Sequence, residues 1–294
     1  MIRKYLILIL LWSSMAFGQA FDPDSAFHFL TKQVDFGPRN PGSTGHDKCA
    51  DYLAQQMKKY AGNVEIQKFA VSGYGEQLRL KNIISRFNPG VRDRLLLCAH
   101  WDTRPRADYA ERNKDLPIAG ANDGASGVAV LLEIARQLSI SEPGYGIDIV
   151  LFDGEDYGLE GDLDLYFLGA KNFVKVNEIG QYREGILLDM IGDKELTIYR
   201  EYYSQKYAPE LADKLWNIAW DLGMMGFQTN VNYAIQDDHL ILNKAGIPTV
   251  DIIDFEYPDK QNSYWHTHRD VPENCSPESL NEVGTVVMNY IYQR

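Results

Sequence analysis

The sequence predicts an α/β fold: a three-layer α/β/α sandwich with a mixed, mostly parallel central sheet. Short apolar runs, such as RLLLCA at 94–99, alternate with amphipathic segments at helical spacing. That alternation is typical of strands covered by helices on both faces. The chain has 294 residues, of which 45% are hydrophobic and 24% charged, as in ordinary globular proteins. No repeat or Pro/Gly/Ser-rich linker divides it, so we expect a single domain over residues 19–294.

The first 18 residues are expected to be a signal peptide. Arg3 and Lys4 form a basic start, residues 5–12 are apolar, and residues 16–18 are small or aromatic in the order that a signal peptidase reads. The apolar run is too short for a bilayer, which needs roughly 20 such residues. We therefore expect an exported protein, periplasmic or secreted, that begins at Gln19 and has no transmembrane anchor.

Net charge and cysteine content indicate which partners and which cysteine chemistry to expect. The formal charge is −12, which argues against a nucleic-acid partner, because binding the phosphate backbone of a nucleic acid needs clustered Lys and Arg. The three cysteines, Cys49, Cys98 and Cys275, form no metal-binding pair, so we expect buried free thiols. The oligomeric state is left open, with a monomer as the simplest expectation.

The elements follow in order along the chain. Helical spacing predicts helices at 24–34 and 45–60, and two alternating segments at 64–71 and 80–87 predict paired strands. Apolar runs then predict strands at 94–99, 147–152, 185–188 and 247–253. Amphipathic segments predict helices at 125–138, 166–174, 209–222 and 279–292. A tyrosine-rich stretch at 199–207 is expected to form a surface hairpin or lid.

Residues able to bind a metal or move a proton follow the predicted central strands. In open α/β sheets, loops at the carboxyl ends of strands are where ligands bind. Each such residue alone is explained as a helix cap or a polar group with a structural partner, but together they predict a site. The candidates are His100, Asp102, Asp123, Glu155, Asp156, Asp189, Asp237, His239 and His266.

Three of these residues form a zinc-binding set. Catalytic zinc takes three His or carboxylate ligands and keeps one position open, and Asp123, Asp156 and His266 supply such a set from three strand ends. Glu155, next to Asp156, remains free to act as a general base. Asp102 is placed to accept a hydrogen bond from the His100 imidazole and orient it.

Arginines and further histidines near these segments have structural explanations. Arg104 and Arg106 are expected to offset nearby acidic charge, with a substrate carboxylate as the alternative partner. His46 is expected at the surface, and His239 is expected to bond backbone beside the acidic pair.

The segments HWD, GANDGASG, FDGED, LLD and WHTH, in this order and spacing, resemble the zinc-dependent aminopeptidase-like family. AIQDDH at 234–239 and YWHT at 264–267 are more specific, and resemble its glutaminyl cyclase (glutaminyl-peptide cyclotransferase) branch. The resemblance covers roughly residues 25–290. It implies cyclisation of an N-terminal glutamine to pyroglutamate with release of ammonia, with peptides and proteins that begin with Gln as substrates. Because the expected mature chain begins at Gln19, we also expect exported proteins cleaved before Gln, this chain included, to be substrates.

The resemblance also implies a role for each matching residue. Zinc, held by Asp123, Asp156 and His266, would polarise the γ-carbonyl, and Glu155 would shuttle the proton. The family often has Glu where this chain has Asp156, so the loop must bring the shorter side chain closer. Asp189 and Asp237 match paired acids beside the reacting centre. Matching pocket residues are Ile235, Gln236 and Trp265, with Tyr257 as a looser match.

Two alternatives remain at this point. One is a two-zinc aminopeptidase, because His100 and Asp189 complete the five ligand positions that such an enzyme uses. The Asp237-Asp238 pair together with Trp265 favours a closed amide pocket, hence the cyclase with one zinc. The other alternative is a non-catalytic receptor on the same scaffold, against which the presence of Glu155 counts.

Overall fold

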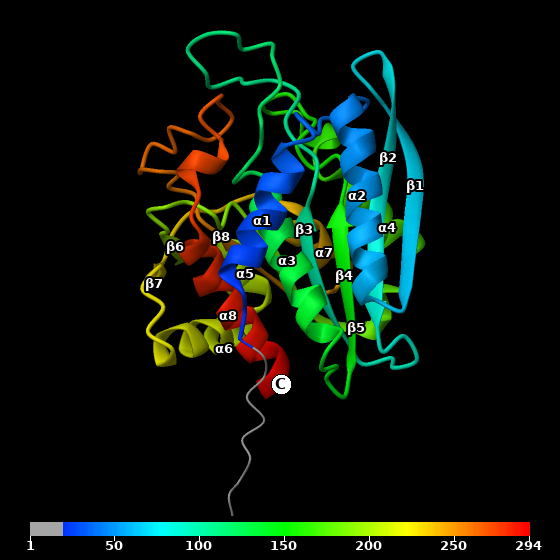
Figure 1. Cartoon of the computed structure of the whole chain (residues 1–294), viewed down its shortest axis with the longest axis vertical. Coiled ribbons are helices and arrows are strands. Elements are labelled where there is room, and N and C mark those ends of the chain that lie inside the picture. Colours follow the sequence, from blue (N-terminus) through cyan, green and yellow to red (C-terminus); the bar gives the residue numbers. More distant parts are fainter. Residues whose placement is uncertain (1–19) are drawn as a thin grey trace, which may run out of the picture.

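The computed structural model describes residues 20–294 of the chain (Figure 1). The predicted signal peptide and Gln19 lie outside these residues and remain predictions. Among the described residues, no helix combines the length and apolar character needed to cross a membrane.

A six-stranded sheet forms the centre of the protein and has the order β1-β2-β4-β3-β5-β8. β3 pairs in parallel with β4 and β5, and β5 pairs in parallel with β8, whereas β1, β2 and β4 pair antiparallel. The predicted mixed, mostly parallel sheet is therefore confirmed. The strands are β1 (Asn63–Gly73), β2 (Glu76–Phe87), β3 (Arg94–His100), β4 (Gly146–Phe152), β5 (Tyr182–Asp189) and β8 (Thr249–Ile253).

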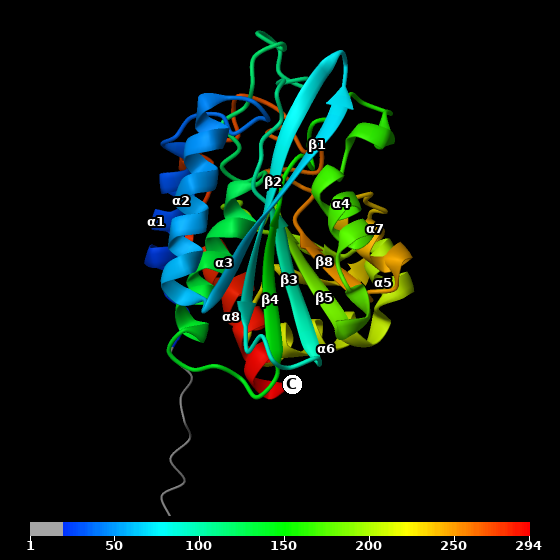
Figure 2. The same ribbon diagram turned by 90° about the vertical axis from the view of Figure 1, so that its right-hand side faces the viewer.

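Helices cover both faces of this sheet. Figure 2 shows α1, α2, α3 and α8 on one side and α4, α5 and α7 on the other, which gives the three predicted layers. β3 and β4 are buried at every residue, as their apolar sequences require. The helices of the first face are α1 (Pro23–Val34), α2 (Thr44–Tyr60), α3 (Ala125–Leu138) and α8 (Pro277–Gln293). Those of the second are α4 (Leu168–Val176), α5 (Tyr202–Tyr207) and α7 (Asp238–Ala245).

Most predicted elements agree with the structure to within a few residues, but two regions differ. The tyrosine-rich stretch forms β6 (Ile198–Arg200) and α5, and β6 pairs in parallel with β7 (Phe227–Val231) around α6 (Pro209–Asp221) rather than forming a hairpin. Helix α7 was not predicted from the sequence. This helix has only eight residues, and its buried side chains include the polar Asp238 and His239, so no apolar periodicity marks it.

The carboxyl ends of β3, β4 and β5 meet at one edge of the sheet, the upper end in Figure 1. The loop after β3 leads into α3 through Gly124, whose φ of 97° suits glycine. A Cβ there would lie 2.5 Å from the Asp102 carbonyl oxygen, so the loop packs against the end of β3 only because Gly124 has no side chain.

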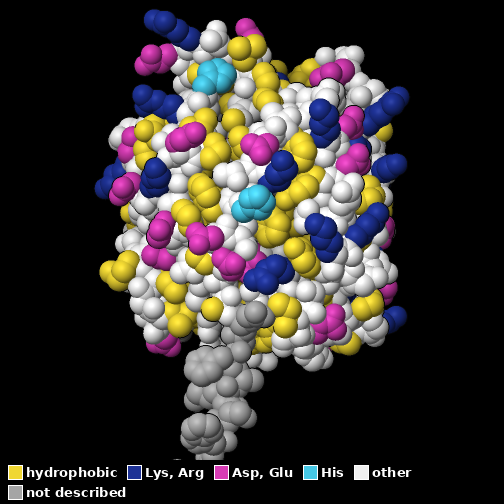
Figure 3. All heavy atoms as spheres, in the orientation of Figure 1, with side chains coloured by type: hydrophobic (Ala, Val, Ile, Leu, Met, Phe, Trp, Pro, Cys, Tyr) yellow, Lys and Arg dark blue, Asp and Glu magenta, His cyan; other side chains and the backbone are white. Residues whose placement is uncertain are grey.

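Acidic, basic and apolar side chains are intermixed on the face shown in Figure 3. Cys49, Cys98 and Cys275 are buried and free, as predicted.

Candidate metal centre and adjoining cavity

Asp123, Asp156 and His266 come together at this edge with the spacing of metal ligands. Nε2 of His266 lies 3.5 Å from Oδ2 of Asp123 and 3.4 Å from Oδ1 of Asp156. Two ligands of a tetrahedral zinc ion with bonds of roughly 2.0 Å lie about 3.3 Å apart. Oδ2 of Asp123 and Oδ2 of Asp156 are buried with no hydrogen-bond partner in the described part of the chain. Buried carboxylate oxygens require a donor or a cation, so this set fits zinc.

The loop that carries Asp123 is fixed by buried charged groups. The Asp270 carboxylate accepts hydrogen bonds from the backbone N–H groups of Asn122 at 2.7 Å and Asp123 at 3.2 Å. Arg39, which is fully buried, donates to the carbonyl oxygens of Gly120, at 2.6 Å, and Trp101, at 3.1 Å. These bonds hold Asp123 rigidly before α3.

Asp102 orders the loop after β4. Its carboxylate accepts hydrogen bonds from the backbone N–H groups of Glu155 at 3.0 Å and Asp156 at 3.3 Å. Nδ1 of His100 lies 3.7 Å from Asp102 Oδ1, which is longer than a hydrogen bond, contrary to the expectation that Asp102 orients this imidazole. Asp102 therefore positions the candidate general base Glu155 and the candidate metal ligand Asp156 through their backbone.

Arg104 contacts one of the three candidate metal ligands, Asp156, directly. Its buried guanidinium donates to Asp156 Oδ1 at 2.7 Å and also pairs with Asp108, so it offsets acidic charge as predicted. Burial raises the pKa of Asp156 well above its usual range, while Arg104 opposes this rise. Arg104 thus holds the short Asp156 side chain in place and leaves Oδ2 free.

His266 sits in a strained and aromatic environment. Its φ of 54° lies in the left-handed region, which is uncommon for a residue with a Cβ and typical of functional sites. Its ring stacks on Trp265 and Tyr109, with centroids 3.7 and 5.8 Å away. Burial and the nearby Arg104 hold the pKa of His266 well below its usual value, which favours the neutral form that binds metals.

A second donor set shares Asp123 with the first. Nε2 of His100 lies 3.2 Å from Asp123 Oδ1 and 3.2 Å from Asp189 Oδ1. Burial lowers the pKa of His100, but Asp189 and the other acids outweigh it and raise this pKa well above its usual value. Protonated His100 would bridge the two carboxylates, whereas neutral His100 would offer a second metal position. Ligand spacing alone is compatible with one ion or two.

A cavity of about 280 Å³ opens over these residues. Glu155, Asp189 and Asp237 line it together with the metal-ligand set, so the structure brings the predicted acids into one place. Its size is near the lower end of the range for ligand pockets, which suits one side chain rather than a length of peptide. The remaining predicted lining residues, Ile235, Gln236 and Trp265, also face this cavity.

The cavity also has walls that sequence reasoning missed or misplaced. Tyr257 does not line it, contrary to expectation; this side chain is fully buried, and its hydroxyl donates to Asp270 at 3.2 Å. Aromatic walls come instead from other loops at the strand ends, and only the rule that such loops converge on the site could have pointed to them. They are Tyr109, Tyr166, Phe167 and Phe255.

Two carboxyl groups that line the cavity have raised pKa values. Burial raises the pKa of Glu155 well above its usual range, and the charges of Asp237 and Asp156 raise it further. Burial and the neighbouring Asp189 raise the pKa of Asp237 to about 8. Carboxyl groups with raised pKa values are suited to transferring protons near neutral pH.

Glu201 connects the cavity wall to the second layer of helices. Its carboxylate accepts hydrogen bonds from the Ile235 N–H at 3.0 Å and from the backbone of α5, and contacts Nε2 of His239 at 3.1 Å. His239 therefore bonds a side chain rather than the backbone expected for it. His46 is also not at the surface, because it is buried and lies 2.9 Å from the Asp153 carboxylate.

A mostly parallel sheet whose strand-end loops bring together a buried donor set with zinc-type spacing is typical of a metal-dependent α/β enzyme. Residues 82–291 match the model of Peptidase family M28, and the chain belongs to that family.

Solved structures and curated relatives are similar over nearly the whole chain. A glutaminyl cyclase from Tannerella forsythia is 40% identical with a TM-score of 0.89, over 94% of this chain and 99% of that one. A Zn-dependent exopeptidase from Parabacteroides distasonis is 39% identical with a TM-score of 0.90, over 94% of this chain and 100% of that one. A bovine glutaminyl-peptide cyclotransferase is 23% identical over 291 residues, 87% of this chain and 78% of its own length.

Proposed function

We propose that this protein is a glutaminyl-peptide cyclotransferase, which converts the N-terminal glutamine of peptides and proteins to pyroglutamate and releases ammonia. One observation carries the proposal. The Ile235–Asp237 segment and Trp265 enter the same small cavity as Glu155 and the donor set. The similarity to glutaminyl cyclases over 94% of the chain supports the same reading.

One zinc ion, held by Asp123, Asp156 and His266, completes the site in this proposal. Zinc bound there supplies a Lewis acid for the γ-carbonyl of the substrate glutamine. The remaining work falls to the protein. Ile235 and Trp265 hold the glutamine side chain folded back towards its own α-amine, which makes the reaction intramolecular and lowers its entropic cost.

Glu155 transfers the proton. The α-amine nitrogen forms a bond to the γ-carbonyl carbon, and the bond from that carbon to the amide nitrogen breaks. Glu155 accepts the proton that the amine loses and donates it to the departing nitrogen, which leaves as ammonia. The Asp102 carboxylate holds Glu155 by its backbone, so the side chain is free to serve both nitrogens.

Asp189 and Asp237 bind the leaving amide. Both line the cavity, and burial together with the charge of Asp189 raises the pKa of Asp237 to about 8, so Asp237 carries a proton at neutral pH. The Asp237 proton and the Asp189 oxygen atoms provide one donor and one acceptor for an NH₂ group. The aromatic walls exclude water, which would otherwise compete with the amine as nucleophile.

Hydrolysis of N-terminal residues is the second candidate, and the His100, Asp123 and Asp189 cluster favours it, because these residues offer a second metal position. Incubating the purified protein with a Gln-initiated and an Ala-initiated tetrapeptide separates the two. Cyclisation releases ammonia from the first peptide only, whereas an aminopeptidase shortens both.

A further inference from the structure

We infer that a groove beside the cavity binds the part of the substrate that follows the N-terminal glutamine, and that its basic rim selects acidic side chains there. This inference rests on the proposed function, because it assigns the preferred peptide of the same site.

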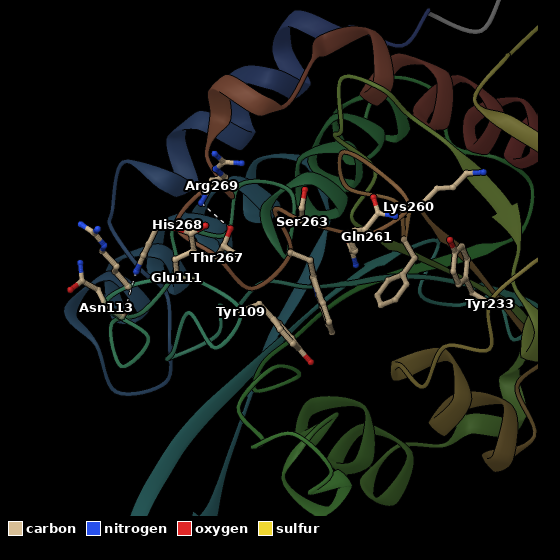
Figure 4. A pocket seen from close by; sticks show the side chains of 15 residues that line it. Tyr109, Glu111, Asn113, Tyr233, Lys260, Gln261, Ser263, Thr267, His268 and Arg269 are labelled. Carbon is tan, nitrogen blue, oxygen red and sulfur yellow. Dashed lines mark hydrogen bonds between the residues drawn. The ribbon is translucent and has the colours of Figure 1, made fainter.

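The groove continues directly from the cavity. It has a volume of about 820 Å³ and lies between the loop after β3 and the loop after β8 (Figure 4). Tyr109, Phe255 and Trp265 line both spaces. The rings of Tyr109 and Trp265 stack 5.2 Å apart, and the Phe255 ring meets Trp265 edge-on at 5.1 Å. A peptide whose first residue occupies the small cavity leaves across these rings, and the groove is the space it enters.

Positive charge gathers along this groove in a chain with a formal charge of −12. Arg112, Lys260 and Arg269 line it and are exposed, whereas Glu111 is the one acidic residue among its described lining residues. In the view of Figure 4, Lys260 and Arg269 lie on either side of Tyr109. The local charge is therefore opposite to that of the molecule as a whole, which favours an acidic partner at this place.

These three cations are not neutralised by acids; the Arg269 guanidinium stacks over the Tyr264 ring at 5.2 Å and keeps its charge. None of them forms an ion pair with any residue in the range 20–294. The nearest acid in sequence to Lys260 is Asp259, which is engaged elsewhere. Its carboxylate accepts hydrogen bonds from the Ser263 hydroxyl at 2.6 Å and the Gln261 N–H at 3.0 Å within its own loop.

The expected preference is modest because the groove is open to solvent. An exposed ion pair contributes little and is screened by salt. We expect two glutamates after the N-terminal glutamine to raise kcat/KM by about threefold to tenfold at low ionic strength, with the gain falling towards unity in ~0.5 M salt. If the charge of the whole protein decided the rate, the acidic peptide would be repelled and would react more slowly than the alanine peptide.

The experiment compares Gln-Glu-Glu-Ala-amide with Gln-Ala-Ala-Ala-amide by ammonia release, in one preparation, so that differences in the folded fraction cancel from the ratio. The groove variant combines Arg112→Gln, Lys260→Gln and Arg269→Gln. A charge-matched control combines Lys48→Gln, Lys58→Gln and Lys214→Gln, three exposed lysines of α2 and α6.

We expect the acidic peptide to lose its advantage in the groove variant and to keep it in the control. Equal kcat/KM values for both peptides in the unmodified protein, or the same change in both variants, would overturn the inference and leave the cyclase proposal intact. If the unmodified protein cyclises neither peptide, the proposed function itself fails, and the inference with it.

Discussion

Replacing Glu155 with glutamine removes the proton carrier and little else. The side chain forms no ion pair with Lys or Arg among the described residues, and its closest charged contact is Nδ1 of His100 at 4.0 Å. The hydrogen bond that fixes residue 155 runs from its backbone N–H to Asp102 and survives the substitution. Glu155→Gln also replaces a largely buried carboxyl group by a neutral amide of nearly the same shape.

The expected loss follows from the role of the carboxylate. General acid–base groups contribute about 10²- to 10⁴-fold to rate, which corresponds to roughly 3 to 5 kcal/mol of transition-state stabilisation. We therefore expect kcat for Gln-Ala-Ala-Ala-amide to fall by at least about 100-fold. The zinc content should stay at the unmodified level, because Glu155 is not among the three ligands, and the melting temperature should stay equal or rise.

The assay couples ammonia release to zinc analysis and thermal unfolding of the same samples. Glu178→Gln, at an exposed position away from the cavity, controls for the loss of one negative charge. A Glu155→Gln variant with full activity would refute the assigned role. A variant without zinc would show instead that Glu155 serves as a ligand.

Further predictions concern the metal, the loops and the buried acids. Chelation should abolish cyclisation, and one equivalent of zinc should restore it; zinc titration measures this, and a requirement for two equivalents would favour the aminopeptidase-type centre. His100→Ala should retain one zinc and measurable cyclisation, since His100 is not among the three ligands and contacts Oδ1 of Asp123, whereas His266 lies beside Oδ2; complete loss of zinc would contradict this. Gly124→Ala should lower the melting temperature and zinc affinity, because its Cβ would clash with a backbone oxygen and its φ is positive; unchanged values would contradict the close packing. Burial raises the pKa of Asp254 to about 7, so its stabilising contribution is complete below its unfolded value near 3.8 and is lost as pH rises through 7. Denaturant unfolding measures the free energy of unfolding as a function of pH. Between pH 5 and 8 this free energy should fall less in Asp254→Asn than in the unmodified protein, by on the order of 2 kcal/mol. An equal fall in both proteins would contradict the prediction.

The sequence predicted the sheet and the donor set well because both follow from strong local signals. Strands β3 and β4 are apolar at nearly every position, and a polar residue after such a strand must lie at the carboxyl edge of the sheet. Asp156 follows β4 closely, and Asp123 and His266 lie in the longer loops after β3 and β8, which return to the same edge of the sheet.

The walls of the cavity could not be predicted in the same way. Tyr109 and Tyr257 both lie in loops that return to the site, yet one faces the cavity and the other is buried against Asp270. That difference depends on loop conformation, which no periodicity encodes. Arg104 and Asp156, which are in contact, likewise lie 52 positions apart in the chain. The sequence therefore indicated that Arg104 offsets acidic charge, but not which acid it contacts.

The most direct test of the central claim is mass spectrometry of Gln-Ala-Ala-Ala-amide after incubation with the zinc-loaded protein. The account predicts a product lighter by about 17 Da that keeps all four residues, because the glutamine amine displaces its own side-chain ammonia. A product shortened by its first residue would contradict the account, and would show that the same centre directs water rather than the amine to a carbonyl carbon.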